Sequence, residues 1–239
     1  MKNVLVSGGS RGIGEAIVRR FALLGYRVAF TYKCSDEKAE MIKNECGAVG
    51  FRCDFEKIDE IIDVYKKVVD YFGGGVDILV NNAAISEIKL FCDISNDDWK
   101  KMIDVNLTAP FVLSRECVSS MIKKHSGRII NISSMWGECG ASCEVHYSAA
   151  KAGLIGMTKA LAKELGPTQI TVNCITPGVI DTDMNSHLSK EDREALIDDT
   201  PLMRIGTVDD VACAVTFLAS ESASFITGQV IGVNGGMVI

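Results

Sequence analysis

The chain has 239 residues, of which 47% are hydrophobic and 23% are charged, and its formal net charge at pH 7 is −6. This composition excludes a disordered or fibrous chain, and the negative charge without any long basic cluster argues against nucleic acid as a partner. The opening MKNVLVSGGS is too short an apolar run for a signal peptide, and no stretch approaches a membrane span. We therefore expect one domain over residues 1–239, located in the cytoplasm.

Nine cysteines are scattered along the chain without a CxxC pair, which favours free thiols in a reducing compartment. Cys139, Cys143 and His146 form the one local cluster and can be read as three metal ligands. A local fourth ligand and zinc-type spacing are both missing from that segment, so we expect no metal site.

Short β-branched runs alternate with amphipathic stretches along the chain. The predicted strands are NVLVS, RVAFTY, AVGFRCD, DILVNNA, RIINIS, ITVNCIT and QVIGVNG, and the predicted helices cover residues 12–24, 36–46, 57–72, 99–123 and 146–165. Gly25 and Gly73 stand where left-handed caps end helices. The rhythm predicts a Rossmann-type, doubly wound parallel sheet of seven strands with helices on both faces. Residues 181–207 are the only long irregular stretch, and we expect a lid or binding element there.

The first strand leads directly into a glycine-rich turn and then a helix. Backbone amides and the positive helix terminus at this place suit a pyrophosphate, although the same turn can exist without a ligand. The residues predicted to bind there are Gly8, Ser10, Arg11, Gly12, Ile13 and Gly14.

The second strand ends in Tyr32 and Lys33, where NAD-binding proteins of this fold place an acidic residue. A carboxylate would repel a 2′-phosphate, whereas Lys33 and Arg11 are able to neutralise it. The alternative is that both are solvated surface cations. The sequence favours NADP(H).

Ser134 follows the strand RIINIS, and Tyr147 and Lys151 lie four residues apart on the helix 146–165. A ketone that gains a hydride needs a proton, which Tyr147 can supply, and a donor for its oxygen, which Ser134 can supply. Lowering the tyrosine pKa from about 10 to near 7 takes about 4 kcal/mol, which we expect from the Lys151 ammonium. His146 points about a third of a turn away, so we expect a pocket-wall or surface residue.

Several motifs in chain order resemble the short-chain dehydrogenase/reductase family. Ser7-Gly8-x-x-x-Gly12-Ile13-Gly14 resembles TGxxxGIG, Asn81-Asn82-Ala83-Ala84 resembles NNAG, and Pro177-Gly178 resembles the later PG motif. Asn106 in a VNL, Ser134, Tyr147 and Lys151 fall on the family's active-site positions. Ser7 for threonine and Ala84 for glycine are the two departures. The similarity covers essentially the whole chain.

This resemblance implies further roles. Asn106 would join a water-linked proton relay as a catalytic residue, and Lys151 would also hold the nicotinamide ribose. Asp54 would bond the adenine of the cofactor. The other implied cofactor contacts are Asn82, Phe55, Ile180 and Thr182.

Within the family, the sequence resembles 3-oxoacyl-(acyl-carrier-protein) reductases, which implies reduction of a ketone on acyl carrier protein by a homotetramer. The segment SSMWGECGASCEVHYSAAKAG also resembles reductases of a ketone on a modified lysine of elongation factor P. A third reading is a non-catalytic, NADP(H)-binding regulatory protein, since fold alone does not fix function.

Reductases of the first type commonly present two arginines to the acidic carrier protein, and those places here hold His125 and Thr168. We expect Lys123, Lys124 and Arg128 to retain some positive charge nearby. The apolar run 225–239 is a candidate tetramer contact or, alternatively, the last core strand.

Overall fold

The computed structural model describes residues 1–185 and 189–239. Within these residues, seven strands form one sheet in the order β3-β2-β1-β4-β5-β6-β7, and every pairing is parallel. The strands are β1 (Asn3–Val6), β2 (Arg27–Tyr32), β3 (Val49–Arg52), β4 (Ile78–Asn81), β5 (Gly127–Ile132), β6 (Ile170–Pro177) and β7 (Val230–Val233). The predicted Rossmann-type sheet is confirmed.

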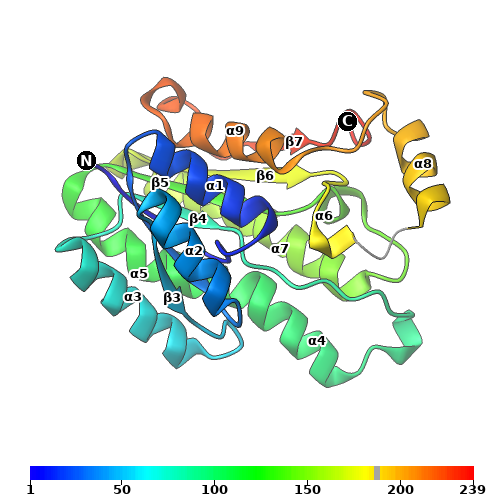
Figure 1. Cartoon of the computed structure of the whole chain (residues 1–239), viewed down its shortest axis with the longest axis horizontal. Coiled ribbons are helices and arrows are strands. Elements are labelled where there is room, and N and C mark those ends of the chain that lie inside the picture. Colours follow the sequence, from blue (N-terminus) through cyan, green and yellow to red (C-terminus); the bar gives the residue numbers. More distant parts are fainter. Residues whose placement is uncertain (186–188) are drawn as a thin grey trace.

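Helices cover both faces of this sheet. They are α1 (Gly12–Leu23), α2 (Asp36–Cys46), α3 (Ile58–Phe72), α4 (Asn96–Ile103), α5 (Ala109–Lys124), α6 (Trp136–Cys139), α7 (Val145–Leu165), α8 (Lys190–Asp198) and α9 (Val208–Ala219). Figure 1 shows α1, α2 and α9 on one face, and α3, α5 and α7 pack on the other. No helix in the described part of the chain has the length and apolar character needed to cross a membrane.

The strands are apolar on both sides because both faces are covered. In β1, Val4 and Val6 belong to the core under α1, α2 and α9, whereas Leu5 between them belongs to the core under α3, α5 and α7. Successive side chains of a strand point to opposite faces, so one uninterrupted apolar run serves two cores.

The strand order reverses direction at β1, because β2 and β3 lie on one side of β1 and β4 to β7 lie on the other. Val6 pairs with Phe30 of β2 on one side and with Val80 of β4 on the other. In open α/β sheets, ligands bind outside the carboxyl ends of the strands at such a switch point. The segments that leave β1 and β4 therefore define where a site is expected.

The prediction of one continuous helix over residues 99–123 is wrong. The segment forms two helices, α4 and α5, separated by a π-helical turn at Asp104–Thr108. The first of them begins at Asn96, where Ser95 and Asp98 form a capping box. The turn carries Asn106, whose side chain bonds the backbone of Ile85 in both directions, at 3.1 Å from Ile85 N and 3.0 Å from Ile85 O. Single π turns of this kind are frequent at functional sites.

The prediction that residues 181–207 are irregular is also wrong in part. Ser189 and Asp192 form a capping box that starts α8, and residues 186–188 of that stretch lie outside the described residues. The helix α9, which the sequence reading omitted, starts from a third capping box between Thr207 and Asp210. The expected left-handed caps are confirmed, since φ is +80° at Gly25 and +63° at Gly73.

Candidate active site

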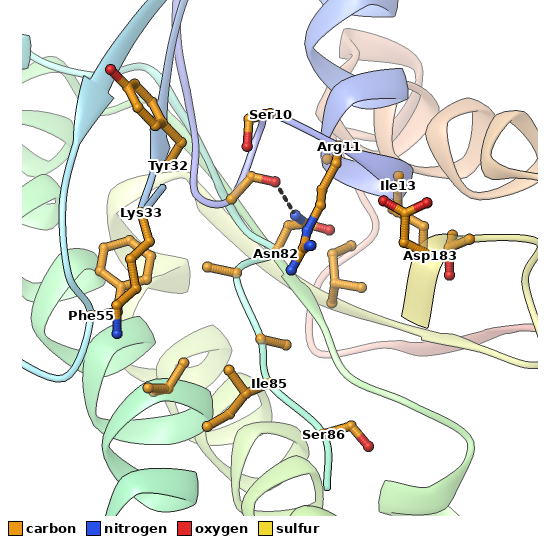
Figure 2. A pocket seen from close by; sticks show the side chains of 18 of the residues that line it. Ser10, Arg11, Ile13, Tyr32, Lys33, Phe55, Asn82, Ile85, Ser86 and Asp183 are labelled. Carbon is orange, nitrogen blue, oxygen red and sulfur yellow. Dashed lines mark hydrogen bonds between the residues drawn. The ribbon is translucent and has the colours of Figure 1, made fainter. Parts of the chain in front are cut away.

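A cavity of about 610 Å³ opens at the carboxyl ends of the strands, and Figure 2 shows some of its lining. This volume suits a cofactor-sized ligand. Of the predicted site residues, all except Asn106 line it. They are Gly8, Ser10, Arg11, Gly12, Ile13, Gly14, Tyr32, Lys33, Asp54, Phe55, Asn82, Ser134, Tyr147, Lys151, Ile180 and Thr182.

The glycine turn after β1 is folded tightly against the start of α1. A Cβ on Gly14 would lie 2.0 Å from the carbonyl oxygen of Gly8 and 2.5 Å from Nδ2 of Asn82. Gly8 itself has φ +68°, a conformation that side chains disfavour. The turn therefore needs glycine at both places to keep its backbone against the cavity.

Ser7 and Asn82 join the ends of β1 and β4. The Ser7 hydroxyl accepts hydrogen bonds from the backbone N–H of Asn82 (2.9 Å) and of Ala83 (3.0 Å). In return, the Asn82 side-chain amide donates to the carbonyl oxygens of Ser7 (2.9 Å) and Gly8 (3.0 Å). Asn82 lies at the cavity as expected, and its amide also holds the glycine turn in place.

Lys33 makes contacts that the sequence reading did not anticipate. Its Nζ lies 2.9 Å from Asp54 Oδ1 and 2.7 Å from Glu56 Oε1. Figure 2 shows the side chain running toward Phe55, on the other side of the pocket from Arg11. The expectation of a lysine available to a phosphate is not met in this structure, because two carboxylates already bind its ammonium group.

The segment after β6 lies next to the glycine turn and forms part of the cavity wall. Ile180 is buried and forms an isolated parallel bridge with Gly206. A Cβ on Gly12 would lie 3.4 Å from Cγ2 of Thr182, so this segment and the glycine turn stand in near contact. Residues far apart in the sequence thus enclose the same end of the cavity.

Ser134, Tyr147 and Lys151 lie together at the cavity, and these residues are 8%, 7% and 2% exposed. Lys151 Nζ donates a 2.9 Å hydrogen bond to the carbonyl oxygen of Ile132 at the end of β5 and lies 5.6 Å from the centre of the Tyr147 ring. The hydroxyl of the neighbouring Ser133 donates to the carbonyl oxygen of Lys151 at 2.9 Å. These bonds fix α7 against β5.

The expected low pKa of Tyr147 is not found in this structure. Burial raises the pKa of Tyr147 to about 12, although a hydrogen bond with Ser134 opposes the shift, and the nearby Glu144 carboxylate adds to it. Burial also lowers the pKa of Lys151 to about 8. The sequence reading allowed for the attraction of the ammonium group but not for the cost of burying both charges.

Asn106 and His146 differ from what the sequence indicates. Asn106 is fully buried and does not line the cavity; its amide reaches Met102 Sδ and the backbone of Ile85. His146 was expected at the pocket wall or the surface, but it is fully buried and does not line the cavity, and its Nε2 lies 3.8 Å from Glu87 Oε2. Within residues 1–185 and 189–239, no group of three or more His, Cys, Asp or Glu side chains is arranged to hold a metal ion.

Several residues that line the cavity were not predicted. They include Cys34, Ser35, Glu56, Ser86, Ser133 and Asp183. Ser35 had a usable signal, since it stands immediately before the predicted helix 36–46, in the position where helix N-termini begin. Ser86 lies in the loop after β4, and Asp183 begins a 3-10 turn after β6 (Asp183–Asn185); the sequence specifies the course of neither segment.

Comparison with known proteins assigns the class. A family model described as enoyl-(acyl carrier protein) reductase matches residues 8–238. The chain belongs to the short-chain dehydrogenase/reductase family, and it is an oxidoreductase acting on CH–OH and C=O groups with NADP(H).

Curated relatives match over nearly the whole chain. The chain is 44% identical to the 3-oxoacyl-(acyl-carrier-protein) reductase FabG of Aquifex aeolicus, with 98% of this chain and 96% of the relative covered. It is 42% identical to the FabG proteins of Staphylococcus epidermidis (99% and 98% covered) and of Vibrio cholerae (99% and 97% covered).

Proposed function

We propose that this protein reduces a ketone to an alcohol with NADPH, with Tyr147 as proton donor. The observation that carries the proposal is the burial of Ser134, Tyr147 and Lys151 side by side in the cavity that also includes the glycine turn. A binding protein without turnover has no need for a buried hydroxyl, phenol and ammonium group at one place, since each costs free energy to desolvate.

The lining residues fit the cofactor. The bare backbone at Gly8 and Gly14 leaves a cradle that a Cβ would fill, at the N-terminus of α1, which suits a pyrophosphate. Lys151 lies on the β5 side, where the nicotinamide ribose would be held. Tyr32, Lys33, Asp54 and Phe55 lie on the β2 and β3 side, which leaves them the adenosine half. Ile180 and Thr182, in the segment after β6, would contact the nicotinamide end of the cofactor.

The bound cofactor supplies the hydride. Tyr147 then donates its proton to the developing alkoxide, and Ser134 donates a hydrogen bond to the same oxygen. Lys151, held by the Ile132 carbonyl at 2.9 Å, places its positive charge beside the phenolate that Tyr147 leaves behind. Asn106, the member proposed for a water-linked proton relay, lies outside the cavity and holds the backbone of Ile85, which lines it.

Cofactor selectivity provides one test. Because Tyr32 occupies the place of the usual acid and Arg11 lies at the glycine turn, NADPH should bind at least about tenfold more tightly than NADH, a difference of about 1.4 kcal/mol. Tyr32→Asp should shift the preference toward NADH, since a carboxylate accepts from ribose hydroxyls and repels phosphate. Fluorescence titration of both cofactors measures this, and equal affinities in the unaltered protein would contradict it.

The rate of reduction should depend on pH through Lys151. Its pKa of about 8 means that the ammonium form prevails below that pH and is lost above it. Tyr147, with a pKa of about 12, stays protonated over the same range. We therefore expect kcat to fall as the pH rises through about 8, and the residual rate of Lys151→Ala to lack this fall. A kcat that stays constant or increases across that pH range would contradict the role of the ammonium group.

The substrate proposed first is a 3-oxoacyl group on an acyl carrier protein, by likeness to the FabG relatives. One expectation about docking needs correction. Arg128 is buried and pairs with Glu221 at 3.3 Å, and Lys124 pairs with Asp77 at 2.6 Å. Glu221 also pairs with Lys2, so Arg128 shares this one carboxylate with a second cation, whereas Lys124 has Asp77 as its partner. Lys123 is the one of the three expected cations that forms no ion pair with the described residues.

The second candidate is a ketone on a modified lysine of elongation factor P, and the resemblance of the segment at residues 133–153 supports it. The two substrates should be compared in one assay at matched concentration. Faster turnover of the carrier-protein ketoester supports the first candidate, and faster turnover of the modified factor supports the second. Slow turnover of both would refute both and leave an unrelated ketone.

We also propose a cytoplasmic homotetramer. All nine cysteines are free in the described residues, which suits a reducing compartment. Phe225 and Ile239 are fully exposed in the single chain, an arrangement that a neighbouring subunit could cover. Light scattering at micromolar concentration should give the mass of four chains, and a stable monomer would contradict this assembly.

A further inference from the structure

Glu144 stands at the start of α7, three residues before Tyr147. The two side chains therefore leave the same side of the first turn of the helix. Glu144 makes no capping bond to the helix backbone. Its Oε1 instead accepts a 2.6 Å hydrogen bond from Ser86 Oγ, and Ser86 lines the cavity on the segment after β4 (Figure 2). The carboxylate thus reaches the cavity wall beside the proton donor.

Backbone bonds hold both sides of this contact in place. The backbone N–H of Lys89 donates to the carbonyl oxygen of Cys143 at 2.8 Å, which ties the segment after β4 to the residue before Glu144. The backbone N–H of Ser148 donates to the carbonyl oxygen of Glu144 at 2.8 Å. The contact between Ser86 and Glu144 is therefore supported on both segments independently of the two side chains.

The Glu144 carboxylate has no cationic partner in the part of the chain that the structure describes. Lys89, the cation on the same segment as Ser86, pairs with Asp98 at 2.6 Å and with Glu87 at 3.7 Å instead. Glu144 is half-buried, and a carboxylate that has lost part of its water without gaining a cation is costly. Its charge is therefore available to a ligand that brings a cation.

This negative charge acts against the reduction of a neutral ketone. During proton transfer, negative charge develops on the substrate oxygen and on the oxygen of Tyr147, and a nearby carboxylate repels both. The same repulsion is present before substrate binds, since burial raises the pKa of Tyr147 to about 12 and the Glu144 carboxylate adds to that rise. A cation on the substrate would cancel the repulsion.

Ser86 presents matching chemistry at the cavity wall. A serine hydroxyl has one proton, and Ser86 gives it to Glu144, so the lone pairs of the Ser86 oxygen can only accept further hydrogen bonds. An acceptor beside a carboxylate fits a group that carries both N–H donors and a positive charge. A protonated amine has this chemistry.

We propose that Glu144 and Ser86 recognise a protonated amine carried by the ketone substrate, so that the substrate class is an amino ketone rather than a purely aliphatic ketone. This inference rests on the proposed ketone reduction. Glu144 is a specificity-determining residue, because a ketone that brings an ammonium group removes the repulsion at Tyr147 as it binds. A ketone without that group reacts against the repulsion.

Three matched ketones, assayed with NADPH and the whole protein, test this assignment. The first is a straight-chain methyl ketone that ends in an ammonium group, with a chain too long to close into a cyclic imine. The others share its chain and end in a methyl group or in the acetylated amine. The kcat/KM for the ammonium ketone should exceed that for the methyl ketone at least about tenfold, because hydrogen bonds to charged groups are the stronger ones. The acetylated amine keeps an N–H without the charge and should stay within about threefold of the methyl ketone.

Glu144→Gln separates recognition from structure, because glutamine can still accept the hydrogen bond from Ser86. It should lower kcat/KM for the ammonium ketone at least about tenfold. It should raise kcat for the methyl ketone, since the repulsion at Tyr147 is gone, whereas a structural defect would lower both rates. Glu138→Gln is the matched control, because Glu138 is an exposed carboxylate on α6 that does not line the cavity, and it should change neither rate.

Equal kcat/KM for the three ketones in the unaltered protein would overturn the inference, as would reduction of the carrier-protein ketoester with none of the three accepted. A Glu144→Gln variant that slows the ammonium and methyl ketones by the same factor would also overturn it, because the carboxylate would then act on a step that both share. If neither these ketones nor either protein-linked substrate were reduced, the proposed function itself would fail and the inference with it, a result distinct from the others.

Discussion

Replacing Tyr147 by phenylalanine should lower kcat for ketone reduction at least about a hundredfold. A positioned general acid contributes about that much or more to the rate, and phenylalanine removes only the hydroxyl oxygen and its proton. The ring remains, so its packing against Met102 and Ala150 should be retained. NADPH affinity should therefore change little, and stopped-flow measurement of the hydride-transfer step with saturating cofactor gives the comparison.

Ser134→Ala is the control for this variant. It removes a buried hydroxyl of the same site but leaves the proton donor, so it should mainly slow turnover, by a smaller factor than Tyr147→Phe does. Ordinary turnover by Tyr147→Phe would remove Tyr147 from the mechanism. Matching circular dichroism spectra and melting temperatures of the variants would show that the loss is chemical.

The second large effect is expected at the glycine turn. Gly14→Ala places a methyl group where 2.0 Å separates the new carbon from the Gly8 carbonyl oxygen, so the turn or the start of α1 must shift. Overpacking of this kind costs about 1–3 kcal/mol of stability. NADPH affinity should fall at least about a hundredfold, because the displaced backbone is the proposed pyrophosphate cradle.

The same substitution elsewhere gives the control. Gly156 lies in α7, is exposed, and has no atom within 4 Å of where its Cβ would be. Gly156→Ala should raise the melting temperature slightly, since alanine in a helix is favoured over glycine by about 1 kcal/mol. Cofactor binding should not change. NADPH binding by Gly14→Ala at full affinity would contradict the placement of the cofactor on this turn.

The sequence predicts the sheet because its physical signals are local and repeated. Each strand is a short apolar run, and glycines at 25 and 73 end helices where left-handed conformations are needed. Apolar periodicity does not predict helices α8 and α9, although capping boxes at Ser189 and Thr207 mark where both begin. The π turn at Asp104–Thr108 has no such local signal, since it depends on the contact of Asn106 with Ile85.

At the site, the sequence predicts which residues gather but not how they are paired. The carboxyl ends of parallel strands meet at one edge, and this suffices to bring Ser134, Tyr147 and the glycine turn to one cavity. The partners of Lys33 lie more than twenty residues along the chain, on the segment that follows β3. The pKa of Tyr147 depends on burial, which appears only once α7 is packed on β5.

Transfer of a labelled hydride is the most direct measurement of the central claim. NADPH in which both hydrogens of the donating carbon are deuterium should be consumed together with a 3-oxoacyl ketone, and the alcohol formed should carry one deuterium on the carbon that bears the new hydroxyl. The Tyr147→Phe variant should form this product at least about a hundredfold more slowly. A protein that binds NADPH but leaves the ketones of both proposed substrate classes unreduced, or that yields an alcohol without the label, would contradict the assignment.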